Sequence, residues 1–177
     1  AKSVAVVAVD ADGKAKTLDL AALNHVRITL PKAEAGPIRN ISDLAVADGQ
    51  LLVTGQSNEE FSSKIFSIPM PLSADAGGRI FSAETYHISH RKWETKAPIQ
   101  SFIPFNDHGV PCVLGAFACT PIAKLPLKDI TSGANIRGTS VVELGSGHRP
   151  LDLFAYTDSA GKAWVVCNTL RFHQPLF

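Results

Sequence analysis

Cysteine, methionine and tryptophan are scarce in this chain of 177 residues, which has three, one and two of them. An odd and small number of cysteines excludes a fold held by a disulfide framework. A hydrophobic core must therefore stabilise the chain, and hydrophobic residues make up 45% of it, which suffices at this length. We expect Cys112, Cys119 and Cys167 to be small buried apolar residues.

The chain also lacks an excess of charge of either sign. Its 17 basic and 16 acidic residues give a net charge of +1. This balance excludes nucleic acid and anionic membranes as partners attracted by bulk electrostatics. No apolar run reaches the roughly 20 residues that a membrane-spanning helix needs, so no membrane span is expected.

A secretory signal, with its basic segment followed by an apolar one, is missing from the start of the sequence. The first residue is Ala rather than Met, which fits a processed protein and fits a trimmed or partial chain equally well. We expect a periplasmic or extracellular location, with the alternative that the chain is a fragment of a larger protein.

Contiguous catalytic and cofactor motifs are absent too. The sequence contains no CxxCH, HExxH, CxxC, GxSxG, Walker loop or GxGxxG. These absences remove covalent haem, the common zinc protease and serine hydrolase signatures, and the common nucleotide loops from consideration. They leave open a site whose residues come from several distant loops.

Proline and glycine are plentiful and are spread along the whole chain, with 11 and 13 residues. Between them stand short apolar runs, partly β-branched or aromatic, that are bounded by Gly, Asp, Asn and Ser. This pattern is typical of many short strands at regular spacing, and we count about thirteen of them. The sequence therefore predicts an all-β fold.

Three segments of the chain share one order of features: residues 41–72, 99–130 and 150–177. Each begins with an apolar strand and a polar turn that ends at a glycine, and each continues with a more apolar second strand. The first two copies add a third strand that runs into prolines. Residues 83–93 and 138–147 follow these two copies, and we expect them to form a fourth, outer edge strand.

Repeats of this length with four strands each indicate meandering antiparallel sheets. The pattern resembles the blades of a β-propeller, without the WD dipeptide or the kelch double glycine. The resemblance implies about three blades, whereas complete propellers have roughly four to eight. Residues 1–177 are treated as one all-β domain. It is part of a larger propeller, or closes against a partner, or is a β-sandwich or barrel of hairpins.

Two loops, residues 36–43 and 147–152, place a glycine, an arginine and an aspartate at the entrance to a first strand. In a propeller this loop lies at the mouth of the central channel, where forked arginine donors would suit a carboxylate or phosphate. The structural interpretation, which the repetition favours, is that Arg and Asp pair between neighbouring blades. The candidate ligand-binding residues are Arg39, Asp43, His148, Arg149 and Asp152.

Histidines suggest a metal site as a second hypothesis. Odd spacing on a regular strand would point His87 and His90 to opposite faces, so they would share a metal only on a helix or at a bulge. His108 precedes a turn glycine and is a third candidate ligand or general base. The pattern favours a structural role instead, with His87 and His90 on a polar edge strand and His108 in a hairpin turn.

The repeat, together with the missing catalytic motifs, indicates a secreted or periplasmic propeller-type scaffold that binds a small ligand or a protein. Its partner would be another protein or the remaining blades. The alternative is a redox or hydrolytic enzyme, or a subunit of one, with a His/Asp site from several loops and a divalent metal. Bound metal would favour the enzyme, and a large exposed apolar patch would favour the scaffold.

Overall fold

The computed structural model describes residues 6–32, 38–57, 63–118, 121–130, 134–145 and 147–171. Within these ranges the chain forms thirteen strands and one short 3₁₀ helix, which confirms the expected all-β class. None of this described part is a helix with the length and apolar character needed to span a membrane.

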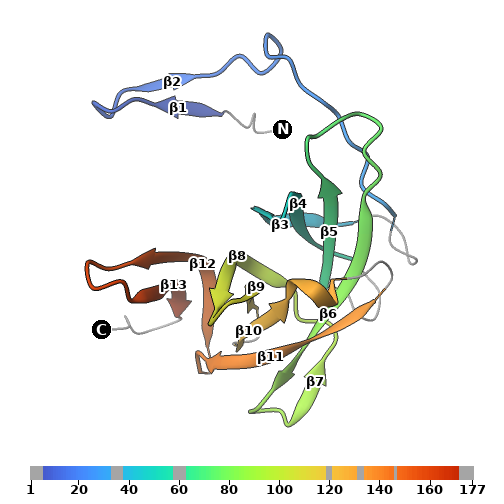
Figure 1. Cartoon of the computed structure of the whole chain (residues 1–177), viewed down its shortest axis with the longest axis vertical. Coiled ribbons are helices and arrows are strands. Elements are labelled where there is room, and N and C mark those ends of the chain that lie inside the picture. Colours follow the sequence, from blue (N-terminus) through green and yellow to red (C-terminus); the bar gives the residue numbers. More distant parts are fainter. Residues whose placement is uncertain are drawn as a thin grey trace.

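A small hairpin precedes the main body. Its two strands, β1 (Val7–Val9) and β2 (Ala15–Thr17), pair antiparallel and are exposed throughout. The Asp10 carboxylate holds the turn by accepting hydrogen bonds from the backbone N–H groups of Asp12 and Lys14. Figure 1 shows this hairpin apart from the other sheets, joined to them by a long extended segment.

Two antiparallel meanders form the main body. Tight turns connect the first two strands of each meander, and Asp48–Gly49 and His108–Gly109 occupy these turns with positive φ. The first meander contains β3 (Asn40–Ala47), β4 (Gln50–Gln56), β5 (Ser63–Pro69) and β6 (Arg79–His87). The second contains β8 (Ile99–Asp107), β9 (Val110–Phe117), β10 (Pro121–Pro126), the 3₁₀ helix η1 (Leu127–Asp129) and β11 (Asn135–Glu143).

The meanders join through their last strands, because β6 and β11 pair in parallel. The sheet order is therefore β3-β4-β5-β6-β11-β10-β9-β8, and its two end strands lie against each other, so the sheet nearly closes into a barrel. The expected outer edge position is wrong for residues 83–85, which pair with β11, whereas in the described part of the second expected edge segment only Gly138 pairs with β6. Gly138 in β11 lies close to β10, since a Cβ there would be 3.0 Å from the Ala123 side chain.

The main core lies between the two meanders. Phe81 and Ile65 come from the first meander, and Phe102, Phe117 and Leu125 come from the second; all are almost fully buried. A second cluster lies on the outer side of β4 and β5, where the extended residues Ile28 and Leu30 cover Val53 and Phe66 without forming a strand. Apolar residues on both faces of the inner strands thus explain their near-continuous hydrophobic sequences.

A third hairpin, β12 (His148–Thr157) and β13 (Ala163–Arg171), packs on the outer side of the second meander. Leu153, Val165 and Cys167 face Leu114 and Ile122 there. Cys112 is buried as expected and Cys167 is half-buried; both are free, and Cys119 lies outside the described residues. Three β-units therefore lie face to face in the order of the chain.

Gly55 in β4 shows how closely these layers approach. A Cβ at this position would lie 2.9 Å from Ile38 Cγ2 and 3.0 Å from the Asn40 carbonyl oxygen. We expect Gly55→Ala to lower the free energy of unfolding by about 2 kcal/mol, because backbone must shift to make room. Gly77→Ala is the matched control, since nothing lies within 4 Å of its Cβ. Urea unfolding of both variants measures the difference, and equal stability would contradict it.

Candidate functional site

A β-bulge interrupts each of the three hairpins β3–β4, β8–β9 and β12–β13 near the start of its first strand. An extra residue in one strand re-aims the side chain that follows it. The residue that follows the bulge is Asp43 in β3, Ser101 in β8 and Asp152 in β12. We refer to these three residues as the hairpin ladder.

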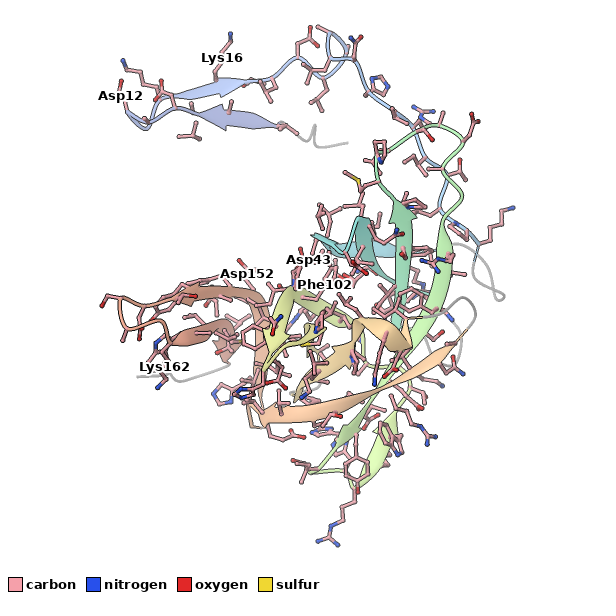
Figure 2. All side chains as sticks on the ribbon, in the orientation of Figure 1. Asp12, Lys16, Asp43, Phe102, Asp152 and Lys162 are labelled. Carbon is pink, nitrogen blue, oxygen red and sulfur yellow. The ribbon has the colours of Figure 1, made fainter. Side chains whose placement is uncertain are left out.

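Hydrogen bonds connect the members of the hairpin ladder. The Ser101 hydroxyl donates to Asp43 Oδ2 at 2.8 Å, and the Phe102 N–H donates to the same oxygen at 2.9 Å. A corresponding hydrogen bond joins the second meander to the third hairpin, because the Leu153 N–H donates to Ser101 Oγ at 3.2 Å. Asp152 Oδ1 lies 3.3 Å from the same hydroxyl. Figure 2 places Asp43, Phe102 and Asp152 where the first strands of the three units meet.

The structure brings two of the five predicted ligand-binding residues together, Asp43 and Asp152, through Ser101. Arg39 is exposed, and Arg149 donates to Gln100 Oε1 from Nη2 at 2.8 Å. Among the described ion pairs, neither arginine pairs with either aspartate. The link between units is therefore carboxylate to hydroxyl and backbone, instead of the expected Arg–Asp pair.

His148 is the remaining member of that predicted set. Its ring is buried, with Nδ1 3.3 Å from the Gly145 carbonyl oxygen. Nε2 is buried without a hydrogen-bond partner among the described residues. Sequence reasoning missed Ser101, although alignment of the copies on Asp43 and Asp152 places Ser101 at the same position.

A second group of polar side chains gathers where β6 ends. The His87 imidazole is buried, with Nδ1 3.7 Å from Glu94 Oε1 and Nε2 3.6 Å from Glu143 Oε2. His90 Nδ1 lies 2.7 Å from the same Glu94 oxygen, and the two imidazole rings are 4.1 Å apart. We call His87, His90, Glu94 and Glu143 the His–Glu cluster.

Local backbone geometry explains how the two histidines meet. β6 ends at His87, and a turn in which Arg91 has φ of 53° sends the chain back as β7 (Lys92–Glu94) along β6. His90 lies in this turn, so the rule that odd spacing on a strand separates two side chains does not apply to it. Glu143 arrives from the end of β11, where it accepts a hydrogen bond from the Ile88 N–H at 3.0 Å.

His108, the third predicted metal ligand, lies elsewhere, in the β8–β9 turn with a fully exposed side chain. Beside it, an ion pair with the Lys124 ammonium holds the pKa of Asp107 below its ordinary value. Burial raises the pKa of the Cys112 and Cys167 thiols. Neither cysteine is therefore set up as a thiolate nucleophile.

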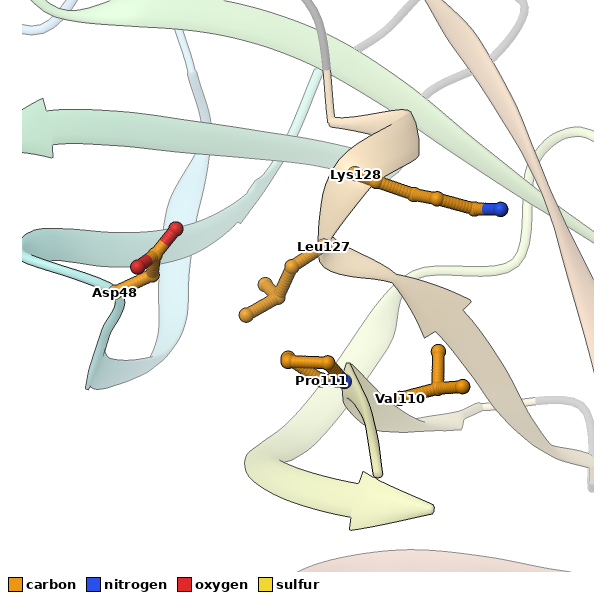
Figure 3. A pocket seen from close by; sticks show the side chains of 5 residues that line it. All are labelled: Asp48, Val110, Pro111, Leu127 and Lys128. Carbon is orange, nitrogen blue, oxygen red and sulfur yellow. The ribbon is translucent and has the colours of Figure 1, made fainter. Parts of the chain in front are cut away.

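A pocket of about 460 Å³ opens between the β3–β4 turn, the start of β9 and η1. Figure 3 shows Leu127 and Pro111 near its middle, with the Lys128 amine pointing away from the Asp48 carboxylate. A ligand site usually has several polar groups that converge on one point. This arrangement lacks that convergence, so the pocket does not by itself indicate a ligand.

The first meander, the second meander and the third hairpin lie face to face, and we call this arrangement the stack. An exposed apolar face remains at each of its two ends. On the outer side of β3, Leu44 and Val46 are 60% and 59% exposed; we call this the β3 face. The other, the β12–β13 face, is the side of the third hairpin turned away from the second meander. Cross-strand pairs form it: Phe154 lies opposite Val166 and Tyr156 lies opposite Trp164, all exposed. Such neighbouring aromatic residues are unusual on a surface that contacts only water.

Comparison with family models, with curated proteins and with solved structures found no match to this chain. The features of the chain that bear on its function are the hairpin ladder, the His–Glu cluster and the two apolar faces.

Proposed function

We propose that this chain is a binding scaffold built from stacked β-units of the propeller type. Its exposed β12–β13 face binds a further β-sheet that continues the stack. In a solution of the chain alone, the partner is a second copy, which contributes its β3 face. Placement in the periplasm or outside the cell belongs to the same proposal and rests on the sequence expectations alone.

The burial of corresponding residues carries the proposal. The residue after each ladder position faces the preceding unit: Phe102 and Leu153 are 1% and 4% exposed, whereas Leu44, on which no unit of the described residues packs, is 60% exposed. The next residue faces the following unit. Ala45 and Ile103 are partly buried there, whereas Phe154 is 53% exposed. Corresponding positions of the three units are thus buried inside the stack and exposed to solvent at its two ends.

The hairpin ladder supports the same direction of growth. Asp43 accepts the Phe102 N–H and Ser101 accepts the Leu153 N–H, so each unit accepts one backbone donor from the next. By this rule we expect the Asp152 carboxylate to accept the N–H of a fourth unit. In a second copy that donor is the Leu44 N–H, the corresponding group of β3. Because its two ends differ, the association is head to tail.

The alternative is a hydrolytic or redox enzyme that uses a metal. The His–Glu cluster is the observation that favours it, because two imidazoles and a carboxylate are common ligands of catalytic metals. The cysteines and the described pocket give this alternative no further support. The scaffold is therefore the function that the geometry supports best.

Self-association tests the proposal. We expect sedimentation equilibrium to show concentration-dependent masses above one chain for the wild type, and one chain for the double variant Phe154→Ser/Trp164→Ser. Removing both aromatic side chains eliminates most of the apolar surface that association would bury. Leu20→Ser is the control: its side chain is equally exposed but lies in the N-terminal segment, so association should persist.

A wild-type chain that sediments as a single copy at every concentration would contradict this proposal. So would a double variant that associates as strongly as the wild type. Far-UV circular dichroism of both proteins establishes that the substitutions leave the β-structure intact.

A further inference from the structure

We infer that the His–Glu cluster is a binding site for a divalent transition metal of the zinc type. His87, His90 and Glu94 are the ligands, and Glu143 orients His87 from outside the coordination sphere. This inference is independent of the scaffold proposal, because the cluster lies on β6, the β6–β7 turn, β7 and β11, away from both apolar faces.

The position of the His87 ring is the first argument. A carboxylate lies near each of its two nitrogens, Glu94 at Nδ1 and Glu143 at Nε2. An imidazole binds a metal through the lone pair of one ring nitrogen. A metal on Nδ1 would lie between His87 and Glu94, the carboxylate on that side of the ring. It binds the Nδ1 lone pair and Glu94, while the Nε2–H points to Glu143.

Metal-bound histidines commonly donate from the second ring nitrogen to a carboxylate, and Glu143 Oε2 lies 3.6 Å from Nε2, on the side of the ring that this role requires. The backbone N–H of Ile88 fixes Glu143 by a 3.0 Å hydrogen bond, so the outer carboxylate is itself held in place. The side chain of His87 is 4% exposed, which leaves its ring little freedom to turn away.

The ligand atoms are close enough for a single ion. One atom each from His87, His90 and Glu94 lie within 4.8 Å of one another. Tetrahedral zinc with bonds of about 2.1 Å needs its ligand atoms about 3.4 Å apart. The His90 side chain is 50% exposed and can make the remaining movement by a change of rotamer.

The ligand set selects the class of metal. Two imidazoles and one carboxylate suit zinc and its neighbours, whereas calcium and magnesium prefer oxygen ligands alone. Three protein ligands leave a fourth position for water. Glu94 belongs to β7, which pairs with β6, and Glu143 at the end of β11 accepts the Ile88 N–H. Metal binding would therefore also stabilise the junction between the two meanders.

Zinc titration of the metal-stripped full chain by calorimetry tests this site. We expect one zinc per chain, and a loss of affinity of at least about 100-fold in both His90→Ala and Glu94→Gln, which each remove one ligand. The matched control is His108→Ala, which removes a fully exposed histidine and should leave zinc affinity unchanged. Glu143→Gln should weaken binding by about tenfold or more, the usual effect of losing an outer carboxylate.

His87→Ala alone is a poor test, because loss of a buried side chain can unfold the protein. The other variants avoid this problem, and each is compared with the wild type by its melting temperature without metal. Saturating zinc should raise that temperature by about 5 to 10 °C in the wild type and not in Glu94→Gln. Cobalt in place of zinc should give the visible bands of a four-coordinate site in the wild type alone.

No heat of binding and no zinc-dependent melting shift in the wild type would overturn the inference. Equal loss of zinc affinity in His108→Ala would also overturn it, since it would place the metal at other residues. Neither outcome bears on self-association, so failure here is distinguishable from failure of the scaffold proposal.

Discussion

Replacing Phe102 by alanine is expected to lower the free energy of unfolding by about 4 kcal/mol. Phe102 is among the largest fully buried side chains and belongs to the core between the two meanders. Its removal takes apolar surface out of the core and leaves a cavity that tightly paired strands cannot collapse to fill. Urea unfolding followed by circular dichroism measures the loss.

Phe154→Ala is the matched control, because the same residue type is 53% exposed on the β12–β13 face. At protein concentrations low enough to keep the chain dissociated, we expect it to change stability by less than about 1 kcal/mol. Equal losses in the two variants would contradict the assignment of Phe102 to the core and of Phe154 to an open face.

Asp43→Ala is expected to cost about 3 kcal/mol of unfolding free energy, or roughly 6 to 12 °C in melting temperature. The carboxylate accepts hydrogen bonds from the Ser101 hydroxyl and from two backbone N–H groups, those of Leu44 and Phe102. Bonds to a charged acceptor contribute more than neutral ones, and two of the donors left behind belong to the buried residues Ser101 and Phe102.

Asp152→Ala provides the comparison, since Asp152 holds the corresponding position in the last unit. Its carboxylate is exposed and accepts one bond of good length, from the Leu153 N–H at 2.8 Å. We therefore expect a loss of about 1 kcal/mol or less. A loss at Asp152 as large as that at Asp43 would show that the hairpin ladder does not depend on a following unit.

Short apolar runs between Gly, Pro and Asx residues were sufficient to predict the strands and the all-β class. The turns at Gly49 and Gly109 were predictable for the same reason, because Asx-Gly and His-Gly steps accommodate positive φ. Whether the units form a propeller stays a proposal. The parallel pairing of β6 with β11 was not predictable, since it joins segments distant in sequence.

The candidate sites were predictable in part. Asp43 and Asp152 were identified because the loops that contain them resemble each other, but the shared partner Ser101 carries a different side chain and was missed. His87 and His90 were identified as residues, yet their proximity depends on a turn at Arg91. Glu94 and Glu143 were missed because only the fold of β6, β7 and β11 brings them to the histidines.

A mixing experiment tests the head-to-tail stack most directly. Leu44→Asp blocks the β3 face and Phe154→Asp blocks the β12–β13 face, so each variant alone keeps one working face and should sediment as a single chain. An equal mixture restores one complete interface, and we predict a two-chain species by sedimentation velocity. If Leu44→Asp alone still associates, or if the mixture remains single chains while the wild type associates, the stack does not grow from one face to the other.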